Sequence, residues 1–346
     1  MYKHIIRPVL FLIYPETVHH MVVGIIKTAF CIPGIAYLSK KFFKVNHPGL
    51  KRTVFGLEFD SAVGLAAGFD KNASFFNEFS NLGFSFIEIG TVTPKGQPGN
   101  PKPRSFRLPN DKALINRMGF NNLGADEIVK NLQKRKTKII IGGNLGKNTL
   151  TPNSQAVNDY IFTFNKLYNY VDYFVVNVSC PNISDLHELQ DKDSLMEILN
   201  SLMTERSKKD KKKPILLKIS PDLNFAQIDE VIEIVAETKI DGIVATNTTT
   251  GRYKLSATEE KIAQIGNGGM SGLPLRDRST EIIKYISLKT DGKLPIIGVG
   301  GIMTPQDAIE KLNAGASLVQ IYSGFIYEGP TLVKQINKAI LASLKG

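Results

Sequence analysis

"YFVVNVSCPN", residues 173–182, contains the pattern that decides the fold of this chain. An apolar, β-branched run ends abruptly in the small and polar residues Asn177, Ser179, Cys180 and Asn182. Continuous apolar runs, rather than alternating ones, are typical of parallel strands that are buried on both faces. The stretch therefore predicts a buried parallel strand with polar side chains at its carboxyl end.

Further runs of the same kind occur along the chain. In order, the eight runs are "VGLAAG" (63–68), "FIEIGTV" (86–92), "KIIIGGNLG" (138–146), "YFVVNVSC" (173–180), "PILLKIS" (214–220), "GIVATNT" (242–248), "PIIGVGG" (295–301) and "SLVQIYSG" (317–324). Helical patterns lie between them, and the one from Asn224 to Lys239 opens on a good capping residue. Strands alternating with helices in this way predict an α/β protein with a (β/α)8 (TIM) barrel, and an open doubly wound sheet is the alternative.

Two intervals, 93–137 and 249–294, are too long for simple crossovers between strands. The first is rich in proline and glycine, and connections of this length are usually functional or disordered. We expect the first interval to form a functional excursion at the barrel mouth.

Residues 1–45 differ in character from the rest of the chain. Apolar residues recur there at near-helical spacing, with breaks at Pro15 and Pro33, and nearly all charges are positive. No stretch reaches the roughly 18 apolar residues that a spanning helix needs. We expect two short amphipathic helices that lie on a membrane surface, followed by a catalytic barrel over residues 46–346. Helices that only pack on the barrel are the alternative.

The composition restricts the possible ligands. The chain has 346 residues, a formal charge of +11, five histidines that form no cluster, and the distant cysteines Cys31 and Cys180. This pattern argues against a disulfide framework and against a metal or iron–sulfur site. The positive charge indicates attraction to anions, but no nucleic-acid-binding motif accompanies it, so nucleic acid is not an expected partner.

In a TIM barrel the chemistry lies at the carboxyl ends of the strands. "GVGGI" after the seventh run and "IYSG" after the eighth offer glycine N–H groups and a hydroxyl where barrels commonly hold a phosphate. Lys218 lies inside an apolar run, and a buried ammonium is costly unless it is paired or its charge is used, for instance by an anionic cofactor ring. Amides at these ends suit a flat ligand with carbonyls, N–H groups and a carboxylate, and the candidates are Asn116, Asn177, Asn182 and Asn247.

Cys180 follows a strand and lies between polar neighbours. A cysteine nucleophile would need an activator such as histidine, and none is evident nearby in the sequence. A general base needs only a lowered pKa and access to a proton, so this role is favoured over that of a small buried hydrophobe.

The chain resembles the dihydroorotate dehydrogenase family. The resemblance covers nearly its whole length and lies in "GLAAGFDKN", "IEIGTVTPKGQPGNPKPRSFRL", "INRMGFNN", "NVSCPN", "ATNTT", "GGMSGLPL", "IIGVGGI" and "LVQIYSGF". The N-terminal segment and "INRMGFNN" are similar to the quinone-dependent (class 2) members, which are peripheral membrane proteins. The resemblance implies oxidation of (S)-dihydroorotate to orotate in de novo pyrimidine (UMP) biosynthesis, with FMN as cofactor and ubiquinone or menaquinone as acceptor.

The resemblance also implies roles for individual residues. FMN is expected at Ala67, Gly68, Phe69, Asp70, Lys71, Thr91, Asn144, Asn177, Lys218, Thr246, Gly272, Gly301, Tyr322 and Ser323. The substrate is expected at Lys71, Asn116, Arg117, Met118, Gly119, Phe120, Asn177, Asn182, Asn247 and Thr248, and the quinone near His19 and Arg107. Cys180 is expected to take the proton from C5 of dihydroorotate while a hydride leaves C6 for flavin N5, and Lys218 to stabilise the reduced ring.

One departure from the class 2 pattern leaves the electron acceptor open. The class usually has serine at the base position, followed by Asn-Thr-Pro-Gly-Leu, whereas this chain has Cys180 followed by "NISDL" (182–186). Cysteine is typical of soluble family members that use fumarate or NAD, so such an enzyme is one alternative. A non-catalytic barrel that binds a phosphorylated ligand or a membrane is the other. The start of the chain has no Arg- and Ser-rich leader, which favours the cytoplasmic side of a bacterial cell membrane.

Overall fold

A closed barrel of parallel strands forms the body of the protein. The computed structural model describes residues 1–178, 192–253 and 255–344, and within these residues eight strands close the barrel. They are β3 (Val63–Asp70), β4 (Phe86–Val92), β9 (Ile140–Leu145), β10 (Tyr173–Asn177), β11 (Ile215–Ile219), β12 (Gly242–Ala245), β14 (Ile296–Val299) and β15 (Leu318–Ile321). β15 pairs with β3, with Gln320 opposite Gly64, so the ring is closed. The predicted TIM barrel is confirmed, each predicted run contains one strand, and an open sheet is excluded.

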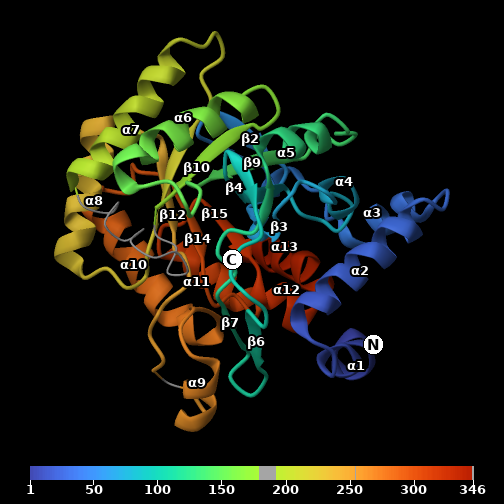
Figure 1. Ribbon diagram of the computed structural model, residues 1–346. Helices are drawn as coiled ribbons and strands as arrows, with labels where there is room; N and C mark the ends of the chain where they lie inside the picture. The colour runs from blue at the N-terminus through green and yellow to red at the C-terminus, as the bar shows by residue number, and fades with distance from the viewer. Residues whose placement is uncertain (179–191, 254, 345–346) are drawn as a thin grey trace.

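Helices surround the barrel (Figure 1). The main ones are α5 (Ala125–Leu132), α6 (Ala156–Leu167), α7 (Lys192–Ser207), α8 (Phe225–Thr238), α10 (Arg276–Lys289), α11 (Pro305–Asn313) and α13 (Thr331–Ser343), with the short α4 (Phe76–Phe79) after β3. The predicted cap of α8 is present, because the Asn224 side chain accepts a hydrogen bond from Gln227 N at 2.9 Å and the Gln227 side chain accepts one from Asn224 N at 3.0 Å. This capping box fixes where α8 begins.

Large aromatic rings pack against glycines inside the barrel. A Cβ on Gly64 would lie 2.4 Å from the Phe86 ring, and one on Gly142 would lie 2.2 Å from the Tyr173 ring. Phe86 and Tyr173 are fully buried, so only glycine leaves room for them on the neighbouring strands. These rings thus fill the space that the glycines leave on the neighbouring strands.

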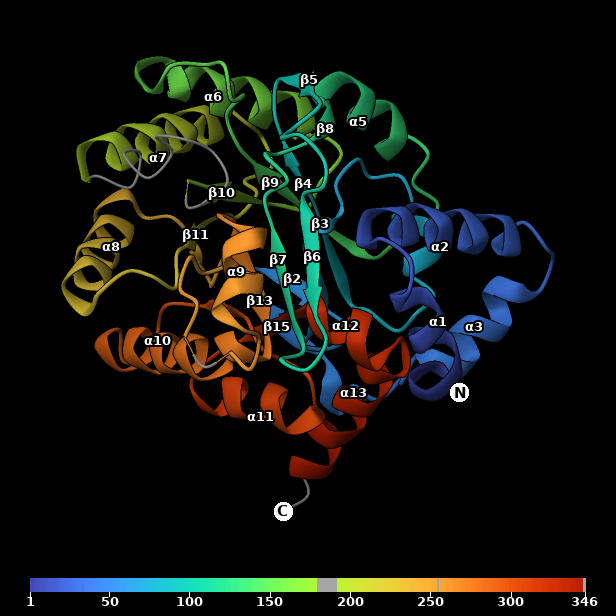
Figure 2. The ribbon, with the colours of Figure 1, turned by 60° about the horizontal axis from the view of Figure 1, so that its bottom comes forward.

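The two long intervals of the chain meet in one antiparallel sheet. β6 (Ser105–Leu108) and β7 (Ala113–Asn116) come from the first interval, and β13 (Gly269–Gly272) from the second pairs with β7. Figure 2 shows β6 and β7 crossing in front of the barrel strands. The same intervals hold β5 (Lys95–Gln97), which pairs with β8 (Asn122–Gly124), and the elements α9 (Glu259–Ile265) and η5 (Leu273–Leu275). The described parts of both intervals therefore meet in this sheet, and the second interval also supplies the barrel helix α10.

The N-terminal segment has more helical pieces than the sequence predicts. A π-helical turn η1 (Tyr2–Ile6) and α1 (Arg7–Phe11) precede the two expected helices, α2 (Pro15–Phe30) and α3 (Ile35–Phe43). The prolines explain the difference, because Pro8 and Pro15 lie in the first turns of α1 and α2, where no backbone N–H donor is needed. Pro15 therefore begins a helix and does not end the structured region.

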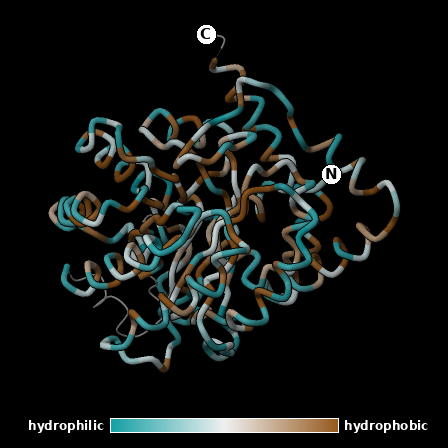
Figure 3. Tube along the Cα trace, turned by 90° about the horizontal axis from the view of Figure 1, so that it is seen from above, coloured by the Kyte–Doolittle hydropathy of each residue, from teal (hydrophilic) through white to brown (hydrophobic). Residues whose placement is uncertain are grey.

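The same segment lies at an edge of the molecule and carries hydrophobic stretches (Figure 3). In the described part of the chain, no single helix combines the length and the apolar character of a membrane span. The pair α2 and α3 passes that test only when joined, and the two are bent by 113°. The shorter elements that follow are η2 (Pro48–Leu50), β1 (Arg52–Val54), β2 (Leu57–Phe59) and, between β9 and α6, η3 (Asn153–Gln155).

Candidate active site

Two opposite charges face each other inside the barrel. Lys218 on β11 is 6% exposed, and its Nζ lies 4.0 Å from Oε1 of Glu88 on β4, which is fully buried. The sequence predicts that the Lys218 ammonium is paired or used, but it does not name Glu88 as a partner. Lys218 and Glu88 carry the same signal in the sequence, because each is a charged residue within an apolar run.

Glu88 also accepts hydrogen bonds from two amides. Asn144 Nδ2 on β9 donates to Oε1 at 2.7 Å, and Gln320 Nε2 on β15 donates to Oε2 at 2.7 Å. Burial, together with the Glu88 charge, raises the pKa of the Tyr173 hydroxyl well above its usual value. The carboxylate thus joins β4, β9, β11 and β15 across the barrel interior.

A chain of side-chain hydrogen bonds continues from Asn144 to neighbouring strand ends. Asn144 Oδ1 accepts from Thr91 Oγ1 at 2.6 Å and from Asn177 Nδ2 at 3.2 Å. Asn177 Nδ2 also donates to Thr91 Oγ1 at 3.1 Å, and Asn177 Oδ1 accepts from Asn247 Nδ2 at 3.2 Å. Four of the predicted site residues are therefore in direct contact, although they come from four separate segments of the chain.

Glycines and hydroxyls meet beyond β14 and β15, where the sequence predicts a phosphate site. A Cβ on Gly301 would lie 2.3 Å from Arg276 Cα, and the φ of Gly301 is +70°, so only glycine fits there. Ser323, the first residue of α12 (Ser323–Glu328), has its Oγ 2.8 Å from Ser271 Oγ. Gly272, also predicted, ends the strand that carries Ser271.

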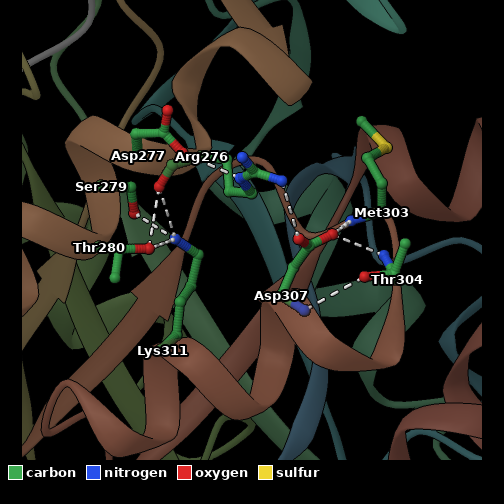
Figure 4. Close-up of polar contacts among 8 residues, drawn as sticks. All are labelled: Arg276, Asp277, Ser279, Thr280, Met303, Thr304, Asp307 and Lys311. Atoms are coloured by element: carbon green, nitrogen blue, oxygen red, sulfur yellow. Dashed lines mark hydrogen bonds and ion pairs between the residues drawn. The ribbon is translucent and has the colours of Figure 1, made fainter.

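A carboxylate holds the turn that follows β14 (Figure 4). Asp307 at the start of α11 accepts hydrogen bonds from Met303 N at 2.9 Å and Thr304 N at 2.7 Å. Its other oxygen lies 3.5 Å from Arg276 Nη1 on α10. The turn that contains Gly301 is thus held from the starts of both flanking helices.

A buried lysine supports the same turn from α11. Lys311 Nζ donates to Arg276 O at 3.2 Å, Ser279 Oγ at 3.2 Å and Thr280 Oγ1 at 3.0 Å (Figure 4). Ser279 Oγ in turn donates to Val299 O, at the end of β14, at 2.6 Å. Burial lowers the pKa of Lys311 to about 7. These contacts connect Lys311 to the backbone directly before the predicted phosphate turn.

The segment after β3 contains five predicted cofactor residues, Ala67 to Lys71. Asp70 is fully buried, and its carboxylate accepts from Ser74 N at 2.7 Å and Phe75 N at 3.0 Å. Burial raises the pKa of Asp70 to about 6. The Asp70 side chain therefore supports the turn after β3. Lys71 Nζ donates a hydrogen bond at 2.5 Å to Oδ1 of Asn121, which belongs to the first excursion.

The rings of Phe69 and Tyr322 meet edge to face, 5.3 Å apart, and burial raises the pKa of Tyr322 to about 12.

The predicted substrate residues 116–120 follow β7. Asn116 Nδ2 donates to Gly269 O at 3.2 Å, and Met118 O accepts from Asn100 N at 3.1 Å. Arg117 donates to the backbone oxygens of Ile265 and, at 3.0 Å, Pro103, so its guanidinium binds neighbouring loops. Gly119 and Phe120 both have a positive φ, +67° and +51°, which turns the chain back toward the barrel.

The segment after β12 holds three predicted residues. Thr246 N donates to Val299 O at 2.9 Å, which anchors the segment to β14. Thr248 N donates to Asn247 Oδ1 at 2.9 Å, so the amide of Asn247 is held at both ends. Cys180 and Asn182, the predicted base and a predicted substrate residue, lie outside the described residues.

The N-terminal helices dock on the barrel through a buried ion pair. Arg104 donates from Nη2 to Glu16 Oε1 at 2.7 Å and from Nε to Oε2 at 3.2 Å, and both side chains are buried. Burial raises the pKa of Glu16, but the hydrogen bond and charge of Arg104 outweigh it and keep the pKa below its usual range. One face of α2 is therefore packed against the excursion that carries Arg104.

The two predicted quinone-proximal residues lie along this junction. The His19 ring on α2 is 5.1 Å from the ring of Phe69, and burial lowers the pKa of His19 to about 4, so the ring is neutral at pH 7. Arg107 Nη1 donates to Ile13 O at 2.6 Å, and its guanidinium lies 4.5 Å from the Phe11 ring. Within the described residues, the buried Arg107 Nε has no hydrogen-bond partner. The junction thus combines the neutral imidazole of His19, the rings of Phe11 and Phe69, and the Arg107 Nε–H donor.

The residues present fit FMN. Lys218 and the amides of Asn144 and Asn177 supply a cation and donors for a ring with carbonyls, and Ser271, Ser323 and the turn at Gly301 suit a phosphate. In residues 1–178, 192–253 and 255–344, no group of three histidine, cysteine or acidic side chains could hold a metal ion.

Comparisons with known proteins identify the family of the chain. The sequence profile of dihydroorotate dehydrogenase matches residues 49–344. A protein of Christiangramia forsetii named "Dihydroorotate dehydrogenase (quinone)" is 54% identical over 99% of both chains, and one of the same name from Thermosynechococcus vestitus is 45% identical over 99% of this chain and 96% of its own. A structure of ligand-free DHODH from Eimeria tenella is similar, with a TM-score of 0.86 and 35% identity over 96% of this chain and 95% of its own. The chain therefore belongs to the dihydroorotate dehydrogenase family.

Proposed function

We propose that this chain oxidises (S)-dihydroorotate to orotate with FMN as its cofactor, and that a quinone receives the electrons. The observation that carries the proposal is the match to a relative named "Dihydroorotate dehydrogenase (quinone)" over 99% of both chains, which includes the N-terminal helices. The contacts among Thr91, Asn144, Asn177 and Lys218 at the strand ends support the same activity.

FMN, when bound, takes up the electrons that the substrate loses and passes them to the acceptor. Lys218 places a positive charge where negative charge develops, and Glu88 keeps that ammonium in position. The residues that would hold FMN are those expected from the sequence, from Ala67 to Lys71, Thr91, Asn144, Asn177, Lys218, Thr246, Gly272, Gly301, Tyr322 and Ser323. Ser271 joins them because its hydroxyl contacts Ser323.

The substrate would lie against the amides above the barrel. Asn177 and Asn247 can orient the carbonyl and N–H groups of a pyrimidine, and Lys71 can attract its carboxylate. The segment 116–120, Asn182 and Thr248 would complete the enclosure. Restraint of this kind places the reacting carbon atoms for proton removal.

Cys180 is the proposed general base for the proton at C5. It follows Asn177 by three positions, and no histidine is within seven positions of it except His187. A thiol needs only a lowered pKa to take that proton. The serine that the class 2 pattern usually has at this position would need more help, because a hydroxyl is less acidic than a thiol.

The quinone would approach through the N-terminal junction. His19 and Arg107 lie there, and the unused Arg107 Nε donor suits a quinone carbonyl. The exposed apolar residues of α1, α2 and α3, with the lysines among them, would place residues 1–45 on a membrane surface, and the barrel of residues 46–346 would stand on its cytoplasmic side. Peripheral attachment to a bacterial cell membrane is the proposed location.

Anaerobic reduction of the purified flavoprotein tests the proposal. We expect dihydroorotate to bleach the FMN spectrum, and a quinone to restore it faster than fumarate or NAD in stopped-flow mixing. Faster recovery with fumarate or NAD would favour the soluble class, to which cysteine at position 180 points. A protein without FMN, or one that dihydroorotate does not bleach, would contradict the proposed reaction.

A further inference from the structure

The hydrogen bonds of the asparagine chain all run in one direction. Asn247 Nδ2 donates to Asn177, Asn177 Nδ2 donates to Asn144, and Asn144 Nδ2 donates to Glu88. The chain begins beside the predicted substrate residue Thr248 and ends on a carboxylate in the barrel interior. A group at one end of the row can fix this common direction, because the orientation of each amide determines that of the next.

Glu88 supplies that cause because an ionised carboxylate only accepts hydrogen bonds. Its Oε1 receives Asn144 Nδ2 and its Oε2 receives Gln320 Nε2, both at 2.7 Å. With Nδ2 of Asn144 turned to the carboxylate, Oδ1 must face Thr91 and Asn177. An amide placed the other way round would put two acceptors against each other in a buried site, which is costly.

The orientation of Asn144 determines the orientations of the Asn177 and Asn247 amides. Asn144 Oδ1 demands a donor, so Asn177 presents Nδ2 and is left with Oδ1 toward Asn247. Asn247 then presents Nδ2 to Asn177, and its Oδ1 accepts from Thr248 N. Each amide therefore shows a defined donor or acceptor edge to the rest of the site.

We propose that Glu88 is a positioning residue that fixes the amide orientations of Asn144, Asn177 and Asn247 for binding of the pyrimidine. The proposal rests on the function proposed above. Glu88 acts through Asn144, and its charge also faces the Lys218 ammonium. Neither the resemblance nor the strand-end pattern assigns it any role.

The two actions of Glu88 differ in the sign of their effect on orotate, which is an anion. Glu88→Met removes a negative charge from the site, and this change alone would strengthen anion binding. The same substitution removes both acceptor oxygens, so Asn144 Nδ2 loses the acceptor that fixes its orientation. Weaker orotate binding would therefore report lost amide orientation and not lost charge.

A swap of the two partners separates orientation from general damage to the barrel. In Glu88→Gln/Gln320→Glu, the amide at position 88 can donate to the carboxylate at position 320 and keep its oxygen toward Asn144. The orientation of the Asn144 amide should then be restored, and the total charge of the pair stays the same. Gln320→Met is the matched control, because it removes a donor from the same carboxylate without touching the asparagine chain.

The experiment titrates each FMN-loaded variant with orotate and follows the flavin absorbance, with thermal unfolding measured in parallel. For Glu88→Met we expect the orotate Kd to rise about tenfold or more. The swap and Gln320→Met should stay within about threefold of the parent, because the asparagine chain is intact in both.

Several outcomes would overturn the proposal. They are an unchanged Kd in Glu88→Met, a loss in the swap as large as in Glu88→Met, or an equal loss in Gln320→Met. If Glu88→Met yields no folded protein, the swap decides, since a folded swap with tenfold weaker binding contradicts the proposal. The parent is titrated first, so a parent that lacks FMN or ignores orotate identifies failure of the proposed function instead.

Discussion

Lys311 is a single residue whose ionisation should be visible in the stability of the whole protein. Its pKa is lowered from 10.5 to about 7 because it is buried in the folded state. The unfolded chain therefore binds more protons between these two values, and the free energy of unfolding rises with pH across that window. Below pH 7 the full penalty for burying the ammonium remains. The relevant neighbours are Asp307, Glu310, Asp277 and Arg276.

We expect Lys311→Met to flatten this pH dependence. The parent should gain stability relative to the variant from about pH 7 upward, by at most about 1.4 kcal/mol per pH unit. Urea unfolding of both proteins at about pH 7 and about pH 9 measures the difference. The control is Lys284→Met, on the exposed side of α10, whose free energy of unfolding should change with pH as that of the parent does. The same pH dependence in Lys311→Met and the parent would contradict a lowered pKa of Lys311.

Cys180 gives the second prediction at this scale, and it rests on sequence alone. In Cys180→Ala we expect the rate of FMN reduction by dihydroorotate to fall about 10²–10⁴-fold, while orotate still binds. Cys180→Ser should keep part of the activity and need a higher pH, because a hydroxyl is less acidic than a thiol. Rapid-mixing reduction measured over a range of pH tests both. An alanine variant as fast as the parent would remove Cys180 from the role of base.

The contacts among strand-end side chains could be predicted because parallel strands bring their carboxyl ends together. Thr91, Asn144 and Asn177 illustrate this, since each lies near the carboxyl end of a predicted strand and they contact one another. Glu88 could not be predicted in the same way. It lies inside its strand, and its importance depends on Asn144 and Gln320, which are distant in sequence.

At the scale of elements, the strands of the barrel could be predicted from the sequence, whereas the strands of the excursions could not. The barrel strands are continuous apolar runs, so burial on both faces makes them recognisable. β6, β7 and β13 are short and lie in segments rich in glycine and proline, and β13 pairs with a strand about 150 positions earlier. Such pairing depends on where the barrel places both segments, which local sequence does not encode.

The docking of α2 depends on the ion pair between Glu16 and Arg104. We expect Arg104→Met to loosen α2 by about 3–5 kcal/mol, because it leaves the Glu16 carboxylate buried without its main partner. Hydrogen exchange of the α2 backbone measures the loss locally. Lys102→Ala removes the exposed partner of Glu16, 3.7 Å away, and should cost less than about 1 kcal/mol. Equal effects of the two variants would argue against a dominant buried pair.

At the scale of the whole molecule, the asparagine chain and the N-terminal junction lie in different parts of the structure. The amide chain lies at the strand ends, whereas His19 on α2 contacts the ring of Phe69. We propose that a water-soluble substrate and an apolar acceptor reach the cofactor from these two different parts. On this proposal, substrate oxidation is separable from delivery of a membrane-dissolved quinone.

The exposed apolar residues of the N-terminal helices should therefore affect membrane binding but not substrate oxidation. Leu12, Ile25 and Leu38 are 87%, 60% and 59% exposed. Replacing all three with serine should weaken binding to anionic lipid vesicles about tenfold or more, because each side chain would lose apolar area buried in lipid. Vesicle co-sedimentation measures this, and reduction of FMN by dihydroorotate in solution should remain at the parent rate. The matched control replaces Leu150 and Leu288, exposed leucines on the barrel at 95% and 69%, and should bind vesicles like the parent. An equal loss in both sets would show that general surface hydrophobicity, and not residues 1–45, holds the protein on the membrane.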